Sequence, residues 1–399
     1  MSSRVFFAPG LLLVLVTIGG RYTLDRAGLL DLAWVDLRVI GLAIALVLLG
    51  LDAAHRPRST GGPGREGWLV AAVLFFLYQI ASGLWAPPAA RVGPQTLDLV
   101  LLGVLVLAFY AYATADPERV IRIVFVLMFV AAVVFALAAL AGGPGEQGRY
   151  SAFGGGPNVF VRIQILGVIS AVAMFLLTGR VWPLLVTPLF LLAAVLSGSR
   201  AGLLAGGVVG FAALLKLRRR LRTGPVVAAG VLLLGVCAAL WAFAPPAFTD
   251  LFQERFVEQT VQEQYLSDRT SIWAAAWNLF LDHPILGAGL DGFYGEIGVN
   301  QMVEYPHNYV LGVAGEGGLI GLGLLATSLV LWTRIVHGGG QRPQLTGLAV
   351  AASVFVSLSS LFSGDYYDSR LAWIFAALAA AAALTPDGAR QPERELVVR

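Results

Sequence analysis

The chain has 399 residues, of which 58% are hydrophobic and only 13% are charged. A soluble domain does not tolerate so apolar a composition, so the sequence indicates an all-α integral membrane protein. The net charge of +3 is small and follows from how basic residues are distributed between the connecting loops, so it gives no indication of nucleic-acid binding.

Apolar runs long enough to cross about 30 Å of hydrocarbon, roughly 20 residues as helix, recur along the chain. The first run follows Arg4 but lacks a good cleavage site, so we interpret it as a helix and not as a signal peptide. We predict about twelve transmembrane helices, at residues 5–20, 39–54, 67–85, 97–114, 119–141, 159–178, 181–197, 201–215, 225–245, 309–332, 344–363 and 370–385.

Basic residues are concentrated in alternate connections, which is typical of cytoplasmic loops. The densest groups are 56–65, 216–222 and 390–399. Both termini are therefore predicted to be cytoplasmic, and one large acidic loop is predicted on the outer face. The predicted organisation is a transmembrane bundle of about nine spans at 1–245, the outer loop at 246–306, C-terminal spans at 307–385 and a cytoplasmic tail at 386–399.

Two arginines lie where predicted helices meet the outer face. Arg162 follows a Gly-Gly-Gly-Pro-Asn turn by a few residues, and Arg200 begins a helix directly after Ser-Gly-Ser. A guanidinium group in hydrocarbon is costly unless it faces a bundle interior, a water-filled cavity or a bound anion. Both residues therefore indicate an anionic ligand. The alternative is that they extend to the interface from helix ends.

The outer loop contributes two further candidates. Arg269 precedes SIWAAAWNLFLDHP, whose apolar residues recur at helical spacing, which predicts an amphipathic helix at the membrane surface. The alternative for Arg269 is an ordinary solvated ion pair. His307 titrates near neutral pH and could accept a proton from a hydroxyl group. Its alternative is a histidine packed at the interface beside Tyr305 and Tyr309.

Four carboxylates are secondary candidates. Glu296 and Glu304 are rival bases in the outer loop, and Asp365 lies in the last outer connection. Glu316 lies deep in apolar sequence and is expected to be protonated or paired, for example with Arg162, with a structural role favoured. No Cys/His cluster has zinc spacing and no outer loop contains a DxD pair, so we predict no metal and no cofactor. A bound diphosphate would then be neutralised by arginines.

Three motifs, SGSRAGLLA, DRTSIWAAAWNLFLDHPILGAGLDGF and YPHNYVLGVAGEGGLIG, occur in this order on one predicted face. Together they resemble the O-antigen ligase and O-antigen polymerase superfamily of bacterial inner-membrane proteins, closely over about 196–330. The resemblance implies a GT-C-like fold and metal-independent transfer of a glycan from undecaprenyl diphosphate to a second saccharide at the periplasmic face. Arg200 and Arg269 match the family's diphosphate-binding arginines, and His307 matches its essential histidine. Arg149 and Arg162 are further candidates for diphosphate binding without a secure match.

The acceptor separates two branches of this superfamily. A ligase passes the glycan to lipid A-core, whereas a polymerase passes it to the next lipid-linked repeat unit, and a chain-length regulator is then an expected partner. FSGDYYDSR and GGGPNVFVR resemble the polymerase branch slightly more, and another polysaccharide polymerase would look the same. A lipid-linked oligosaccharide transporter or flippase is the alternative from another class, but the two halves of the chain show no similarity to each other.

Overall fold

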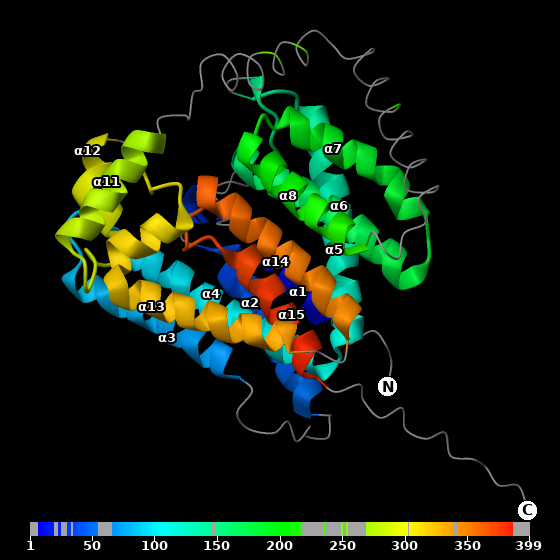
Figure 1. Ribbon diagram of the computed structural model, residues 1–399, viewed down its shortest axis with the longest axis horizontal. Coiled ribbons are helices and arrows are strands. Elements are labelled where there is room, and N and C mark those ends of the chain that lie inside the picture. The colour runs from blue at the N-terminus through cyan, green and yellow to red at the C-terminus, as the bar shows by residue number, and fades with distance from the viewer. Residues whose placement is uncertain are drawn as a thin grey trace, which may run out of the picture.

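The computed structural model describes residues 7–19, 35–54, 66–145, 148–217, 269–301, 303–338 and 342–385, with a few short pieces between them. Nearly all of this part of the chain is helical (Figure 1). The longer helices are α1 (Phe7–Gly19), α2 (Leu37–Ala54), α3 (Gly67–Ala81), α4 (Val92–Ala115), α5 (Pro117–Gly142), α6 (Gly156–Thr178), α7 (Thr187–Leu196), α8 (Arg200–Leu217), α11 (Arg269–Asp282), α13 (Tyr309–His337), α14 (Pro343–Ser363) and α15 (Arg370–Leu384).

Shorter elements join or extend these helices. They are η2 (Leu30–Leu32), η3 (Ser82–Trp85), which extends α3, η5 (Trp182–Val186), which precedes α7, the π-helical turn η7 (Tyr294–Gly298) and α12 (Val299–Gln301). A helix lies at every predicted span except 225–245, which falls outside the described residues.

Six helices in the described ranges are long and apolar enough to cross a membrane: α3 with η3, α4, α5, α6, α13 and α14. Three shorter apolar helices are α1, η5 with α7, and α15. The chain is therefore a multi-pass membrane protein. The count of about twelve spans and the orientation of the termini stay predictions.

The C-terminal helices pack among the N-terminal ones. Helix α13 lies along α3, α15 packs against both α14 and α4, and α5 packs against α6. Large aromatic side chains fill the core between them, for example Phe75 on α3, Phe109 on α4 and Phe375 on α15. Close packing of this kind, and not hydrophobicity alone, holds helices together in a membrane.

Helix α13 is broken near its first third. Gly318 has φ 60° and ψ −158°, a combination that is essentially restricted to glycine. The segment 284–289 fills the break. The N–H groups of Ala288 and Gly289 donate to the carbonyl oxygens of Gly315 and Glu316, at 2.9 and 3.0 Å. Irregular backbone is tolerated beside a membrane when protein groups satisfy it in this way.

The break divides α13 into two parts with different roles. The whole helix has 29 residues, about 43 Å at roughly 1.5 Å per residue. The part from Leu319 to His337 is about 28 Å long by the same measure and alone nearly spans about 30 Å of hydrocarbon. Glu316 therefore lies toward the His307 end of the helix, and its depth in the membrane stays a prediction.

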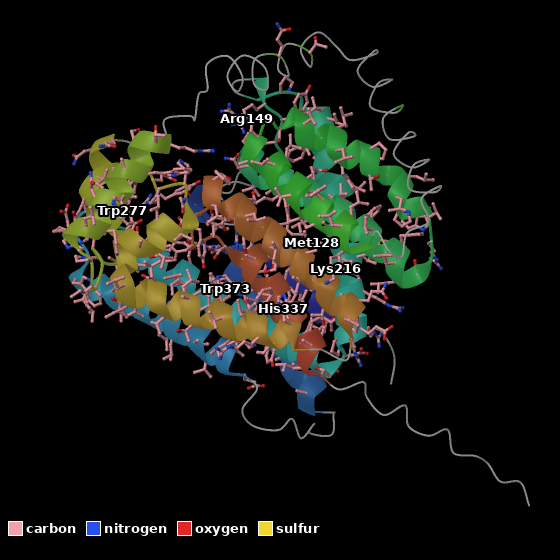
Figure 2. All side chains as sticks on the ribbon, viewed as in Figure 1. Met128, Arg149, Lys216, Trp277, His337 and Trp373 are labelled. Carbon is pink, nitrogen blue, oxygen red and sulfur yellow. The ribbon has the colours of Figure 1, made fainter. Side chains whose placement is uncertain are left out.

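The predicted topology places successive helix ends on alternate faces of the membrane. Lys216 lies in the last turn of α8, and His337 ends α13. In the view of Figure 2, the labels of these two residues lie on the same side of the bundle, apart from those of Arg149 and of Trp277 on α11. This arrangement is compatible with the predicted assignment of these residues to opposite faces of the membrane, which stays a prediction.

Candidate functional site

Arg200 is held at the first position of α8 by the turn that precedes it. The turn Ser197–Gly198–Ser199 reverses the chain after α7, with Gly198 at φ 60°. The Nε of Arg149 donates to the Ser197 carbonyl oxygen at 2.9 Å. The Ser199 hydroxyl donates to the Asn158 side chain at 2.8 Å. Arg149 therefore supports the turn that presents Arg200, in addition to its candidacy as a ligand for phosphate.

Arg269 begins α11, at the position that the sequence predicted for the start of that helix. Burial lowers the pKa of its guanidinium group, and the positive charge of Arg200 lowers that pKa further. The two arginines, which are far apart in the sequence, are thus near each other in the fold. Like charges brought together are unfavourable, and an anion bound between them would relieve the repulsion.

His307 lies in the loop just before α13, one residue before the Asn308 side chain that caps the helix. Its φ of 55° is uncommon for a residue with a side chain. The Tyr305 ring lies 4.3 Å from its ring, centroid to centroid. Its Nδ1 is buried, without a hydrogen-bond partner among the described residues. Burial lowers the pKa of His307 to about 4, and the charge of Arg269 contributes to the shift.

Arg162 is buried inside the bundle on α6 and contacts α14. Its Nε and Nη2 each lie 3.0 Å from a serine hydroxyl, of Ser359 and Ser363 respectively. No carboxylate within the described residues forms an ion pair with it, so the predicted pairing with Glu316 is wrong. The serine partners are neutral, so the guanidinium keeps its positive charge in a buried place.

Tyr305 connects the Arg162 side of the site to the His307 side. Burial raises the pKa of the Tyr305 phenol to about 12, and the nearby Asp365 carboxylate raises it further, whereas the charge of Arg162 opposes the shift. The phenol is therefore protonated at neutral pH. Tyr305 therefore lies close to Arg162, Asp365 and His307.

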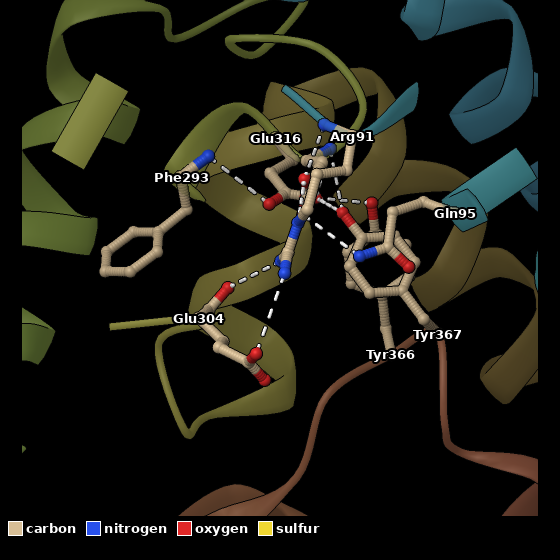
Figure 3. A network of polar contacts seen from close by, with 8 residues as sticks. Arg91, Gln95, Phe293, Glu304, Glu316, Tyr366 and Tyr367 are labelled. Atoms are coloured by element: carbon tan, nitrogen blue, oxygen red, sulfur yellow. Dashed lines mark hydrogen bonds and ion pairs between the residues drawn. The ribbon is translucent and has the colours of Figure 1, made fainter. Parts of the chain in front are cut away.

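Glu316 is the centre of a buried polar network (Figure 3). Its carboxylate accepts hydrogen bonds from the Tyr366 hydroxyl at 2.6 Å and from the Tyr367 hydroxyl. The backbone N–H groups of Asp291 and Phe293 donate to it at 3.2 and 3.3 Å. Polar groups buried without partners are costly, and these four donors explain how the carboxylate is accommodated without Arg162. The arrangement supports a structural role for Glu316.

Asp291 extends this network to the beginning of α4. Its buried carboxylate accepts hydrogen bonds from the backbone N–H and the Nε of Arg91, at 2.8 and 2.9 Å, and from Gln95 at 3.1 Å. The Arg91 guanidinium also lies over the Tyr294 ring, 3.8 Å from its centroid. Neither Arg91 nor Asp291 is among the candidates that the sequence indicated. Arg91 stands in no recognisable motif, whereas Asp291 lies within the motif DRTSIWAAAWNLFLDHPILGAGLDGF but gives no local signal of its distant partners.

We expect Arg91→Ala to lower the free energy of unfolding by about 2 kcal/mol, because it removes a charge-assisted partner from a buried carboxylate. The matched control is Arg122→Ala, which removes an exposed pair with Glu118 on the surface of α5 and should cost under about 1 kcal/mol. Denaturation of both variants in detergent measures the difference. Equal losses would contradict the importance of the Asp291 network.

The secondary carboxylates have other partners. Glu296 lies 3.2 Å from His283, and Glu304 is largely exposed, 3.7 Å from Arg91. Asp365 accepts a hydrogen bond from the Tyr367 backbone N–H at 3.2 Å. Burial raises the pKa of Asp365 well above its ordinary range, and the Glu316 carboxylate contributes. Of these three groups, Asp365 and Glu304 both raise the pKa of Tyr305, Asp365 the more, so both lie near that tyrosine.

The structure brings Arg200, Arg269 and His307 together, with Tyr305 and Arg162 next to them. These residues come from α8, α11, the loop before α13, and α6. We call Arg200, Arg269 and His307 the cationic cluster, after the charges of its two arginines; His307 itself is neutral at pH 7. Within the described ranges, no group of three or more His, Cys, Asp or Glu side chains is arranged to hold a metal ion.

A model of the O-antigen ligase family matches residues 185–326. This match confirms the resemblance to the O-antigen ligase and polymerase superfamily. Members of the superfamily are membrane enzymes of the glycosyltransferase type, which is the class of enzyme that the match supports for this chain. Comparison with curated proteins found no match.

The O-antigen ligase match includes all three members of the cationic cluster, as well as Glu296, Glu304 and Glu316. Arg149, Arg162 and Asp365 lie outside it. The described helices within the O-antigen ligase segment are α7, α8, α11, α12 and the first two thirds of α13. The part of α13 that contains the Gly318 break is therefore included.

Proposed function

We propose that this protein is a metal-independent, inverting glycosyltransferase of a bacterial inner membrane, with both termini in the cytoplasm. It would transfer a glycan from undecaprenyl diphosphate to an acceptor saccharide at the periplasmic face. The observation that carries the proposal is the convergence of two partly buried arginines with a histidine whose pKa of about 4 leaves it neutral at pH 7.

In the proposed reaction, an acceptor hydroxyl oxygen attacks the anomeric carbon of the lipid-linked sugar. The bond from that carbon to the phosphate oxygen breaks, and the diphosphate leaves with the electron pair. Attack from the opposite side inverts the anomeric configuration. The hydroxyl proton passes to His307, whose Nε2 is the candidate atom because its Nδ1 is buried. General base catalysis of this kind contributes about 10²–10⁴-fold.

Arg200 and Arg269 would bind the diphosphate and stabilise the charge that develops as it leaves. A guanidinium fork matches phosphate oxygens geometrically, and a charge fixed in advance in a water-poor place is usually the largest catalytic contribution. Arg162 would add positive potential from within the bundle, since neutral serines hold it. Glu296 and Glu304 remain rival bases, and Asp365, which lies near Tyr305, is a further candidate.

The pH dependence follows from the pKa of His307. A histidine with a pKa of about 4 stays neutral, and so able to accept a proton, until the pH falls through that value. We therefore expect kcat/KM to decline near pH 4, well below the ordinary histidine pKa of about 6.5. Bound diphosphate would offset the charge of Arg269, so kcat should decline at a higher pH than kcat/KM. Coincident declines near pH 6.5 would contradict this assignment.

The family match supports a polymerase and a ligase equally. We favour the polymerase slightly, on the two motifs at 148–162 and 362–370. The deciding assay incubates purified protein with a synthetic undecaprenyl-diphosphate repeat unit, with and without lipid A-core, in the presence of EDTA. A ladder of longer lipid-linked glycans from donor alone would establish a polymerase. Product only when lipid A-core is present would establish a ligase.

The same assay tests the proposal against its main competitors. If EDTA abolishes transfer and magnesium restores it, the metal-independent mechanism is wrong. Donor that crosses vesicle membranes without any glycan transfer would favour the transporter. Stereochemical analysis of the new linkage tests inversion.

A further inference from the structure

Four apolar side chains are exposed together where α3 ends and where the outer loop meets α13. They are Leu84 and Trp85 on η3, and Ile285 and Leu286 in the segment that fills the α13 break. Leu84 is 90% exposed and Ile285 62% exposed. A contiguous exposed apolar patch marks an interaction surface. We propose that these four residues, the outer-leaflet patch, insert into the acyl chains of the outer leaflet of the membrane.

Direct contacts hold the two halves of the outer-leaflet patch together. The Trp85 Nε1 donates to the Gly287 carbonyl oxygen at 3.2 Å. The Tyr78 hydroxyl donates to the Leu286 carbonyl oxygen at 2.9 Å. The Tyr78 and Trp85 rings also contact each other, with centroids 6.2 Å apart. The patch is therefore a fixed feature of the fold, built from segments about 200 residues apart in the sequence.

The outer-leaflet patch continues surfaces that already face lipid. Along α3, Val70, Leu74 and Leu77 are exposed at helical spacing, and Leu84 follows seven residues after Leu77. On α13, the exposed residues Leu319 and Ile320 donate their N–H groups to the carbonyl oxygens of Pro284 and Ile285. The patch thus joins the exposed apolar side of α3 to that of α13. This continuity makes lipid acyl chains the occupant.

The length of α3 sets the level of the outer-leaflet patch. The span Gly67–Trp85 has 19 residues, about 30 Å when its last turn is a 3₁₀ helix. Trp85 therefore lies close to the boundary of the hydrocarbon layer, where tryptophan is enriched. Segment 284–287, although part of the large outer loop, would then lie at the membrane and not in the aqueous phase.

If the outer-leaflet patch inserts into lipid, it also fixes the position of the cationic cluster relative to the membrane. The insertion itself does not depend on the proposed function. The segment that contains Ile285 and Leu286 is bonded through Ala288 and Gly289 to the part of α13 that follows His307. Insertion of the patch would therefore fix the height of His307 above the lipid. An enzyme that uses a membrane-bound donor needs such a fixed height.

A spin-label measurement tests the proposal without any assay of activity. Cys237 is the only cysteine in the chain, so Cys237→Ser gives a background for single labels. Ile285→Cys and Leu84→Cys report on the patch. Leu77→Cys on α3 is the lipid control, and Val299→Cys on α12, 45% exposed, is the water control. Each labelled protein is reconstituted in phospholipid bilayers, and its collisions with oxygen and with a polar nickel chelate are measured.

We expect the ratio of oxygen to nickel collisions at Ile285 and Leu84 to approach the ratio at Leu77 and to exceed that at Val299. A ratio equal to that at Val299 would overturn the proposal. Labels shielded from both reagents would also overturn it and would indicate a second protein molecule on the patch. Because Leu84 is almost fully exposed, its label should not disturb folding, so that position decides the outcome if Ile285→Cys misfolds.

Discussion

Substitution of His307 by alanine should lower the rate of glycan transfer by about 10²–10⁴-fold and leave donor binding nearly unchanged, because the base acts on the acceptor hydroxyl. The effect should appear in kcat, with little change in KM for the donor. Single-turnover assays with a labelled lipid donor measure it. The matched control is His283→Ala, which removes a partly exposed histidine whose partner is Glu296 and should leave the rate within about twofold.

The arginine variants separate the two parts of the site. Arg269→Ala should lower transfer by about 10²–10³-fold, as does loss of a preorganised electrostatic group in other enzymes, and it should also weaken donor binding. Activity retained in His307→Ala but lost in Asp365→Asn would assign the base to Asp365. Full activity in both Arg269→Ala and His307→Ala would show that the cationic cluster is not the catalytic site.

Gly318→Ala should lower the free energy of unfolding by about 3 kcal/mol or more, a large loss for a single added methyl group. The new Cβ would overlap the carbonyl oxygen of Ile285 and lie 2.6 Å from the Gly287 nitrogen. The φ and ψ angles of Gly318 are also unfavourable for any other residue. Thermal unfolding in detergent, followed by circular dichroism, measures the loss.

Gly323→Ala is the matched control for this prediction. It adds the same methyl group to the same helix five residues later, where no atom lies within 4 Å, and alanine is the better helix former by up to about 1 kcal/mol. This variant should be as stable as the parent or slightly more so. Two variants of equal stability would show that α13 can straighten and that segment 284–289 does not depend on the break.

Hydropathy and the positions of basic residues predicted the helices and the common location of the cationic cluster. Arg200, Arg269 and His307 each stand at or just before the beginning of a helix, so the assignment of loops to one face was sufficient to bring them together. Local sequence also predicted α11, because its apolar residues recur at helical spacing. Helices, and residues at the beginnings of helices, could therefore be predicted from one sequence, because the neighbouring residues indicate them.

Side-chain contacts between residues far apart in the sequence could not be predicted. The serines that hold Arg162 are 197 and 201 residues away, and the tyrosines that donate to Glu316 are 50 and 51 residues away. The break at Gly318 was hidden for a different reason. Glycines within an apolar run, such as Gly317 and Gly318, are typical of closely packed membrane helices. The sequence alone does not show that Gly318 takes a non-helical conformation beside the segment 284–289.

The break in α13 also constrains biogenesis. Segment 284–289 leaves the ribosome before α13, yet the carbonyl groups that accept its hydrogen bonds belong to α13. On the predicted topology, the segment would cross the membrane with unpaired N–H groups before the next span is inserted. A nascent chain that ends shortly before Tyr309 would lack the acceptors altogether. A topology reporter fused shortly before Tyr309 should thus report on a protein that lacks these hydrogen bonds. A reporter fused after His337 should report on a protein in which they can form.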